Sequence, residues 1–173
     1  MNKIISVAAA LATLVASSAM AAEGAYNLVS LGVSPLTDQS GTTYGFGVSI
    51  GGGYGFNKYF GVEAQLAVLG IGTGNNVSVM PIPSLTVNGY IPVREGISLY
   101  GKIGKSETIV GYGAAGTQAS YSGVSNFYGA GFEFLSSGSK DTYRIGVDHY
   151  DLGVVPGSPL AANYINLGAT THF

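Results

Sequence analysis

The stretch from Asn163 to Phe173 alternates in polarity and closes on an aromatic residue. Successive side chains of a β-strand point to opposite faces, which divides this stretch into two sets: Ile165, Leu167, Ala169, Thr171 and Phe173 on one face, and Asn166, Gly168, Thr170 and His172 on the other. The first set suits lipid and the second suits a small, wet interior. As an open edge, such a strand would invite aggregation. We therefore expect it to close a barrel by pairing with the first strand.

Residues 1–21 have the pattern of a secretory signal peptide. Lys3 supplies a short basic start, residues 4–15 are apolar, and residues 19–21 form a small-residue cleavage site. A retained membrane anchor is the alternative, but the apolar stretch is short and rich in alanine for a spanning helix, which needs about 20 residues. We expect residues 22–173 to form one mature domain.

Composition favours strands over helices in this domain. Charged residues make up 9% of the chain and hydrophobic residues 46%, yet no segment beyond residue 21 has the ~18 consecutive apolar residues of a spanning helix. The 28 glycines suit a crowded barrel interior. Cysteine is absent, which agrees with passage through an oxidising compartment without disulfides. The net charge of −2 indicates no surface for nucleic acid.

Alternating segments separated by turn residues predict eight strands, at residues 26–34, 43–54, 59–69, 76–90, 97–105, 126–135, 141–150 and 163–173. An even number is usual for bacterial membrane barrels. The predicted fold is therefore all-β: an eight-stranded antiparallel up-and-down transmembrane barrel. Tight turns alternate with longer loops at residues 35–42, 70–75, 107–123 and 151–161, and we expect 107–123 to extend as a hairpin. Pro81 and Pro83 predict a bulge or a locally unpaired edge in the fourth strand.

Aromatic residues gather where the strands meet the tight turns: Tyr54, Phe56, Tyr59, Phe60, Tyr90, Phe134, Tyr143 and Phe173. This pattern is typical of the aromatic girdle of a membrane barrel. A soluble antiparallel sandwich also alternates in polarity, and its aromatic residues would form the core. The signal sequence and the rim aromatics together favour the membrane barrel.

Several segments resemble the OmpA-type outer membrane barrels. Residues 53–63 resemble the hairpin between the second and third strands of that family, and the segments 99–104, 128–133 and 143–148 resemble its fifth, sixth and seventh strands. The resemblance implies an integral protein of the Gram-negative outer membrane, surrounded by membrane lipids and lipopolysaccharide. Many members also carry a peptidoglycan-binding periplasmic domain; we find no counterpart and expect no tether to the cell wall.

The final residues, with Gly168, Thr171 and Phe173, are similar to the terminal signal that the outer-membrane assembly machinery reads in that family. Thr171 departs from the usual hydrophobic residue. The resemblance therefore implies the assembly machinery as a partner.

Four charged residues are predicted to face the interior: Glu63, Lys102, Glu133 and Arg144. An eight-stranded barrel is just wide enough for side chains to fill it, and an unpaired buried charge costs roughly several kcal/mol. We therefore expect an ion-pair network. By resemblance, these positions match interior salt bridges regarded as a candidate gate in the OmpA-type family. We favour a plug that fills the lumen over a gate.

An enzyme would need a nucleophile, a base and an orienting acid within reach. The two histidines are His149 and His172; Asp148 and Asp151 flank His149, and Ser158 follows, but no nucleophile motif accompanies them. No His or Cys cluster has metal-ligand spacing. We predict no catalytic, metal or cofactor residues.

Two functions remain open. In the first, the barrel has a structural and surface-interaction role: it supports membrane integrity, and its external loops contact a host or another surface, because loops on rigid scaffolds carry function. The alternative is a narrow gated porin-like channel for ions or small solutes.

Overall fold

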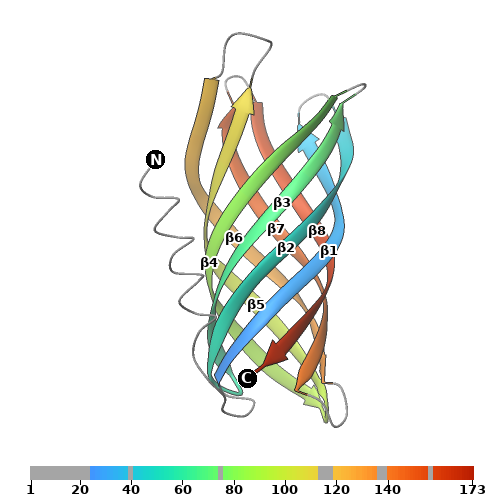
Figure 1. Ribbon diagram of the computed structural model, residues 1–173, viewed down its shortest axis with the longest axis vertical. Coiled ribbons are helices and arrows are strands. Elements are labelled where there is room, and N and C mark those ends of the chain that lie inside the picture. Colours follow the sequence, from blue (N-terminus) through green and yellow to red (C-terminus); the bar gives the residue numbers. More distant parts are fainter. Residues whose placement is uncertain (1–23, 39–40, 74–75, 113–118, 136–139, 156–157) are drawn as a thin grey trace.

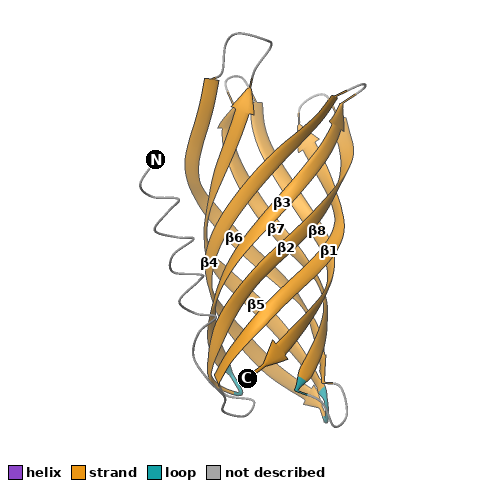
Figure 2. Ribbon diagram, viewed as in Figure 1, coloured by secondary structure: helices purple, strands orange, loops and turns teal. Residues whose placement is uncertain are grey.

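The computed structural model describes residues 24–38, 41–73, 76–112, 119–135, 140–155 and 158–173. In these residues the chain forms eight strands: β1 (Gly24–Asp38), β2 (Gly41–Asn57), β3 (Phe60–Thr73), β4 (Asn76–Arg94), β5 (Ile97–Tyr112), β6 (Ala119–Leu135), β7 (Asp141–Val155) and β8 (Ser158–His172). Figure 1 shows them as one tilted sheet that closes on itself, and Figure 2 shows that the described chain is strand almost throughout. No described helix is long and apolar enough to cross a membrane.

Each strand pairs antiparallel with its sequence neighbours, and β8 pairs with β1 to close the barrel. This last ladder runs from Tyr26↔His172 to Thr37↔Ala161, and the Phe173 N–H donates to the Ala25 carbonyl at 3.1 Å. The predicted eight-stranded barrel is thus confirmed. We call the end with the tight β2–β3 and β4–β5 turns, at the bottom of Figure 1, the turn end, and the opposite end the hairpin end.

The two faces of the sheet have opposite chemistry. Large apolar side chains point outward, and on β2 a row of them is more than half exposed: Tyr44, Phe46, Val48 and Ile50. Polar side chains on the inner face are buried, including Glu63, Asn88 and Lys102. An apolar exterior around a polar interior is the reverse of a soluble sandwich, and it is the arrangement that a hydrocarbon surrounding requires.

The rim aromatics mostly follow the prediction. Tyr54, Phe56, Tyr59, Phe60 and Tyr143 are exposed near the turn end. Tyr90 is an exception, because its hydroxyl lies inside the barrel beside Arg144. Exposed rings beside the tight turns are typical of the aromatic girdle of a membrane barrel.

The strands are longer than predicted at the hairpin end. Residues 35–38, 41–42, 70–73, 107–112, 119–123, 151–155 and 158–161 belong to strands rather than to loops. The predicted hairpin at 107–123 is confirmed, because Tyr112 pairs with Ala119. Alternation of apolar and polar residues is required only where a strand contacts lipid. Backbone pairing does not need an apolar face, so the ladders continue past the end of the alternating pattern.

The prolines of β4 leave one side of that strand unpaired. Pro81 and Pro83 pair with Val68 and Leu66 on β3 without a register shift, whereas the β4–β5 ladder begins only at Ser84↔Ser106. Of the two predicted alternatives, the locally unpaired edge is therefore confirmed, and β4 has no bulge at the two prolines. Residues 76–83 of β4 and 107–112 of β5 thus face each other without a ladder, and we call this region the β4–β5 seam.

The direction of the backbone N–H groups explains the seam. Tyr90 donates its N–H to the carbonyl of Tyr59, the turn residue just before β3, at 2.8 Å. Hydrogen-bonded pairs alternate along an antiparallel ladder. The backbone N–H groups of even-numbered β4 residues therefore point to β3, and those of odd-numbered residues point to β5. Pro81 and Pro83 are odd-numbered and have no N–H to donate. Figure 1 accordingly shows the upper part of β5, with β6 beside it, apart from the upper part of β4.

Candidate functional site

The four charged residues predicted from the sequence lie together inside the barrel. Arg144 on β7 is at their centre: its Nε donates to Glu133 Oε2 and its Nη1 to Glu63 Oε2, each at 2.6 Å. Glu133 is the direct cross-strand neighbour of Arg144. Glu63 reaches Arg144 from β3, across the lumen.

Lys102 joins the same group from β5. Its Nζ lies 3.4 Å from Glu63 Oε1 and 3.1 Å from the carboxylate of Asp148. Glu63, Lys102, Arg144 and Asp148 are each at most 6% exposed. We call these four residues together with Glu133 the interior charge cluster.

Asp148 was missed as a member of this cluster when the sequence was considered alone. It lies on the same inward row of β7 as Arg144, with Gly146 between them. In the sequence, Asp148 is adjacent to His149 and was considered as its catalytic partner. Successive residues of a strand face opposite sides, however, so the two side chains point apart. The period-two pattern already placed Asp148 inward, and that signal could have found it. With Asp148, the cluster has three carboxylates for two cations.

Neutral donors and acceptors add further hydrogen bonds to the cluster. The Tyr26 hydroxyl donates to Glu63 at 2.9 Å, Arg144 Nη2 donates to the Tyr90 hydroxyl at 3.0 Å, and Asn166 Nδ2 donates to Asp148 at 3.1 Å. Buried charges stabilise a fold only when their remaining hydrogen-bonding capacity is met in this way.

Aromatic rings surround the two cations. The Arg144 guanidinium carbon lies 5.2 Å from the ring centre of Tyr26 and 5.4 Å from that of Tyr100. Lys102 Nζ lies 5.4 Å from the ring centre of Phe127. These distances are in the range of cation–π attraction, so the rings hold the cations in place while they fill the lumen.

A second layer of the interior lies nearer the hairpin end and is apolar. Its buried members are Ala67, Leu69, Met80, Ile82, Phe127, Tyr150, Leu152, Ala162 and Tyr164. Phe127 and Tyr150 pack with their ring centres 4.8 Å apart. We call this group the apolar layer. The described lumen therefore contains two different layers in series, one charged and one apolar.

A vestibule of about 720 Å³ opens below the charge cluster at the turn end. Arg144 and Glu133 line it, together with Tyr26 and His172. Water at the turn end thus reaches the lower side of the cluster.

Among the described side chains, His149 and Asp148 lie on opposite faces of β7 and do not meet. His149 faces outward, where its Nδ1 lies 2.7 Å from Asn163 Oδ1 and its ring stacks on Tyr128. Asp148 is on the opposite face of the same strand. His172 lies beside the Tyr26 ring, and the side chain of Ser158 is outside the described set. In the part of the chain that the structure describes, no group of three or more His, Cys, Asp or Glu could hold a metal ion.

The three residues of the predicted assembly signal lie at the turn end of β8. Gly168 is the cross-strand neighbour of Arg144, the Thr171 hydroxyl donates to Asp141 at 2.8 Å, and Phe173 bonds to β1 through its backbone. Their proposed role in assembly stays a prediction. The predicted signal peptide lies outside the described residues.

A closed eight-stranded antiparallel barrel with an apolar exterior and a polar interior defines the class of small transmembrane β-barrels. The model of the family described as outer membrane protein beta-barrel domain matches residues 7–173. The chain belongs to this family. It is an integral protein of the Gram-negative outer membrane, of the OmpA-like type. Because short turns lie on the periplasmic side of bacterial barrels, we expect its turn end to face the periplasm.

Solved structures agree with this fold. Neisserial surface protein A is 12% identical with a TM-score of 0.77, covering 87% of this chain and 97% of that one. Ail, the attachment invasion locus protein of Yersinia pestis, is 22% identical with a TM-score of 0.60 and coverages of 87% and 99%. The N-terminal β-barrel domain of Pseudomonas aeruginosa OprF is 16% identical with a TM-score of 0.54 and coverages of 87% and 98%. No curated protein matches the sequence significantly.

Proposed function

We propose that this protein is a closed barrel with a structural and surface-interaction role. The side chains that fill the lumen stabilise the fold, and the external hairpins contact another surface. The observation that carries this proposal is the filling of the lumen by two layers in series, the interior charge cluster and the apolar layer. A solute would have to displace both layers.

The two layers would open by different physical changes. Opening the charge cluster means separating Arg144 from Glu63, and breaking a buried pair costs about 3–5 kcal/mol when one partner is left alone. A rearrangement of charges leaves Tyr150 and Tyr164 in place, because these rings are held by packing in the apolar layer. A gate made of the charged residues alone would therefore leave the lumen closed.

The hairpin end offers the contact surface. The segments 35–42, 70–75, 107–123 and 151–161 contain the acidic residues Asp38, Glu107 and Asp151 and no Lys or Arg. Ail has been crystallised in complex with the heparin analogue sucrose octasulfate. Because acidic segments repel a sulfated glycan, we propose that this chain contacts a neutral or cationic surface instead. We also infer that lipopolysaccharide surrounds the outer part of the barrel and that the assembly machinery reads the end of β8.

The function is tested in cells that lack their own adhesins and major porins. Cells displaying the protein should adhere better to a neutral or cationic surface than cells with an empty vector, and should take up small sugars no faster. Exchange of residues 113–118 for a Gly/Ser linker should reduce adhesion and leave the amount of folded barrel unchanged. Faster sugar uptake without adhesion would favour the alternative, a narrow gated channel.

A further inference from the structure

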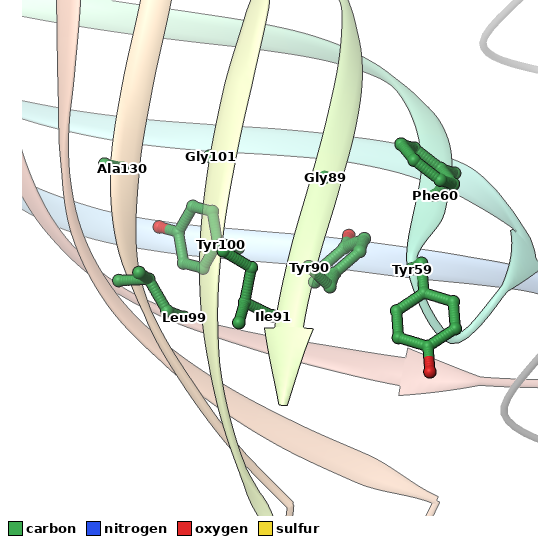
Figure 3. A pocket seen from close by; sticks show the side chains of 9 residues that line it. All are labelled: Tyr59, Phe60, Gly89, Tyr90, Ile91, Leu99, Tyr100, Gly101 and Ala130. Atoms are coloured by element: carbon green, nitrogen blue, oxygen red, sulfur yellow. The ribbon is translucent and has the colours of Figure 1, made fainter. Parts of the chain in front are cut away.

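The lipid-facing surface of the barrel has an apolar groove of about 520 Å³ near the turn end. Its floor crosses three adjacent strands at Gly89, Gly101 and Ala130, which are neighbours in register on β4, β5 and β6. Phe60 forms one wall, and Ile91 and Leu99 lie at its lower edge. Figure 3 shows the bare ribbon at Gly89 and Gly101 between these side chains. We call this feature the outer groove.

Packing within the barrel does not require the two glycines of the groove. A Cβ atom at Gly89 would have no neighbour within 4 Å, and one at Gly101 would meet only the Gly129 carbonyl at 3.9 Å. Other outward glycines differ: a Cβ at Gly52 would lie 3.1 Å from the Tyr26 carbonyl, and one at Gly70 would lie 3.0 Å from the Phe46 ring. Glycine weakens a strand and often marks the close approach of a ligand. The groove therefore has space that the fold itself leaves free.

Charge at the turn end indicates what fills this space. Tyr59 lines the groove, and Lys58 Nζ lies 5.0 Å above the Tyr59 ring centre. The tight turns also carry Arg94 and Lys140 with one acidic residue, Glu95, so their charge is positive overall, whereas the hairpin segments carry no Lys or Arg. An apolar groove in the membrane with a cation beside its periplasmic edge complements a lipid that has an acyl chain and an anionic phosphate.

We propose that the outer groove binds one acyl chain of an anionic glycerophospholipid of the periplasmic leaflet, and that Lys58 pairs with the phosphate of that lipid. Lipid chains are as apolar as leucine, so close packing and the headgroup contact, rather than the hydrophobic effect, select this site. The proposal does not depend on the role of the hairpins, and either can fail without the other.

The test counts lipids that stay on the barrel. The protein is refolded in bilayers of equal amounts of phosphatidylglycerol and phosphatidylcholine, transferred to a mild detergent and weighed by native mass spectrometry. We expect one retained phospholipid per barrel, mostly phosphatidylglycerol. Gly101→Leu and Gly89→Leu fill the groove and should abolish retention. Ala169→Leu adds the same side chain to the outward face of β8 at similar depth and should retain the lipid. If either glycine variant fails to fold, Ala130→Leu, which also fills the groove, is used in its place.

A matched pair of lysine variants tests the headgroup contact. Lys58→Gln should reduce the preference for phosphatidylglycerol over phosphatidylcholine about fivefold, the effect of one lysine at an anionic surface. Lys140→Gln removes another turn-end lysine and should leave the preference unchanged. Absence of a retained lipid on the wild-type protein, equal retention by Gly101→Leu, or a barrel dimer that Gly101→Leu dissociates would each overturn the proposal.

Discussion

Arg144 Nη1 lies 2.6 Å from Glu63 Oε2, and this contact joins strands β7 and β3 across the lumen. In the closed order of eight strands, β3 and β7 are four strands apart in either direction, so they face each other. The pair is a strut across the barrel, and its two residues are separated by 81 positions in the sequence.

Removal of one end of this strut should destabilise the barrel strongly. Arg144→Met leaves Glu63 and Glu133 without their shared cation, and we expect a loss of about 3–5 kcal/mol in the free energy of unfolding. The measurement is urea-induced unfolding in lipid vesicles, followed by the mobility shift on gels. The double variant Arg144→Met, Glu63→Gln should recover part of the loss, because the buried charge at Glu63 is removed with its partner. Additive losses would contradict a direct strut.

Glycines on the inward face should resist substitution, whereas an outward one should not. A Cβ at Gly131 would collide with the backbone of β7 at Ile145 and Gly146, so Gly131→Ala should lower the unfolding free energy by about 1–3 kcal/mol. Gly101→Ala, on the neighbouring strand, points into open space and should change it by less than about 0.5 kcal/mol. Equal effects in the two variants, measured by the same unfolding assay, would show that backbone crowding does not explain Gly131.

Restoring N–H groups at the β4–β5 seam should close it. Pro81→Val and Pro83→Val supply the two donors that face β5, and each new hydrogen bond should add about 0.5–1.5 kcal/mol. Amide hydrogen exchange should become slower at Glu107 and Ile109, the residues opposite the two prolines when the register is continued. Pro92→Val, at the turn end, serves as the control. Unchanged exchange in all three variants would mean that the prolines are not the cause of the seam.

The end of β8 should matter for assembly in cells more than for stability. Phe173→Ala keeps the backbone bond to Ala25, so refolding of the purified protein into micelles should be unchanged. We expect the amount of folded protein in the outer membrane to fall severalfold, as judged by heat-modifiable gel mobility. Loss of refolding in vitro would instead assign Phe173 a structural role, and unchanged yield in cells would remove it from the assembly signal.

The sequence predicted the barrel because the period of two is a local property that each strand displays independently. The same parity placed Glu63, Lys102, Glu133 and Arg144 inside. The ends of the strands could not be predicted, because the alternation of apolar and polar residues marks only the part of a strand that contacts lipid, whereas backbone pairing extends beyond it. The apolar layer was also missed, because the height of Phe127, Tyr150 and Tyr164 in the lumen depends on strand register, which pairing partners far apart in the sequence decide.

The central claim is that the two layers in the lumen keep the barrel closed, and single-channel recording in planar bilayers tests it most directly. The refolded wild-type protein should be silent. Arg144→Ala and Lys102→Ala should also be silent wherever they fold, since the apolar layer stays in place. Discrete openings of the wild-type protein, altered by either substitution, would contradict the account and identify the interior charge cluster as a gate.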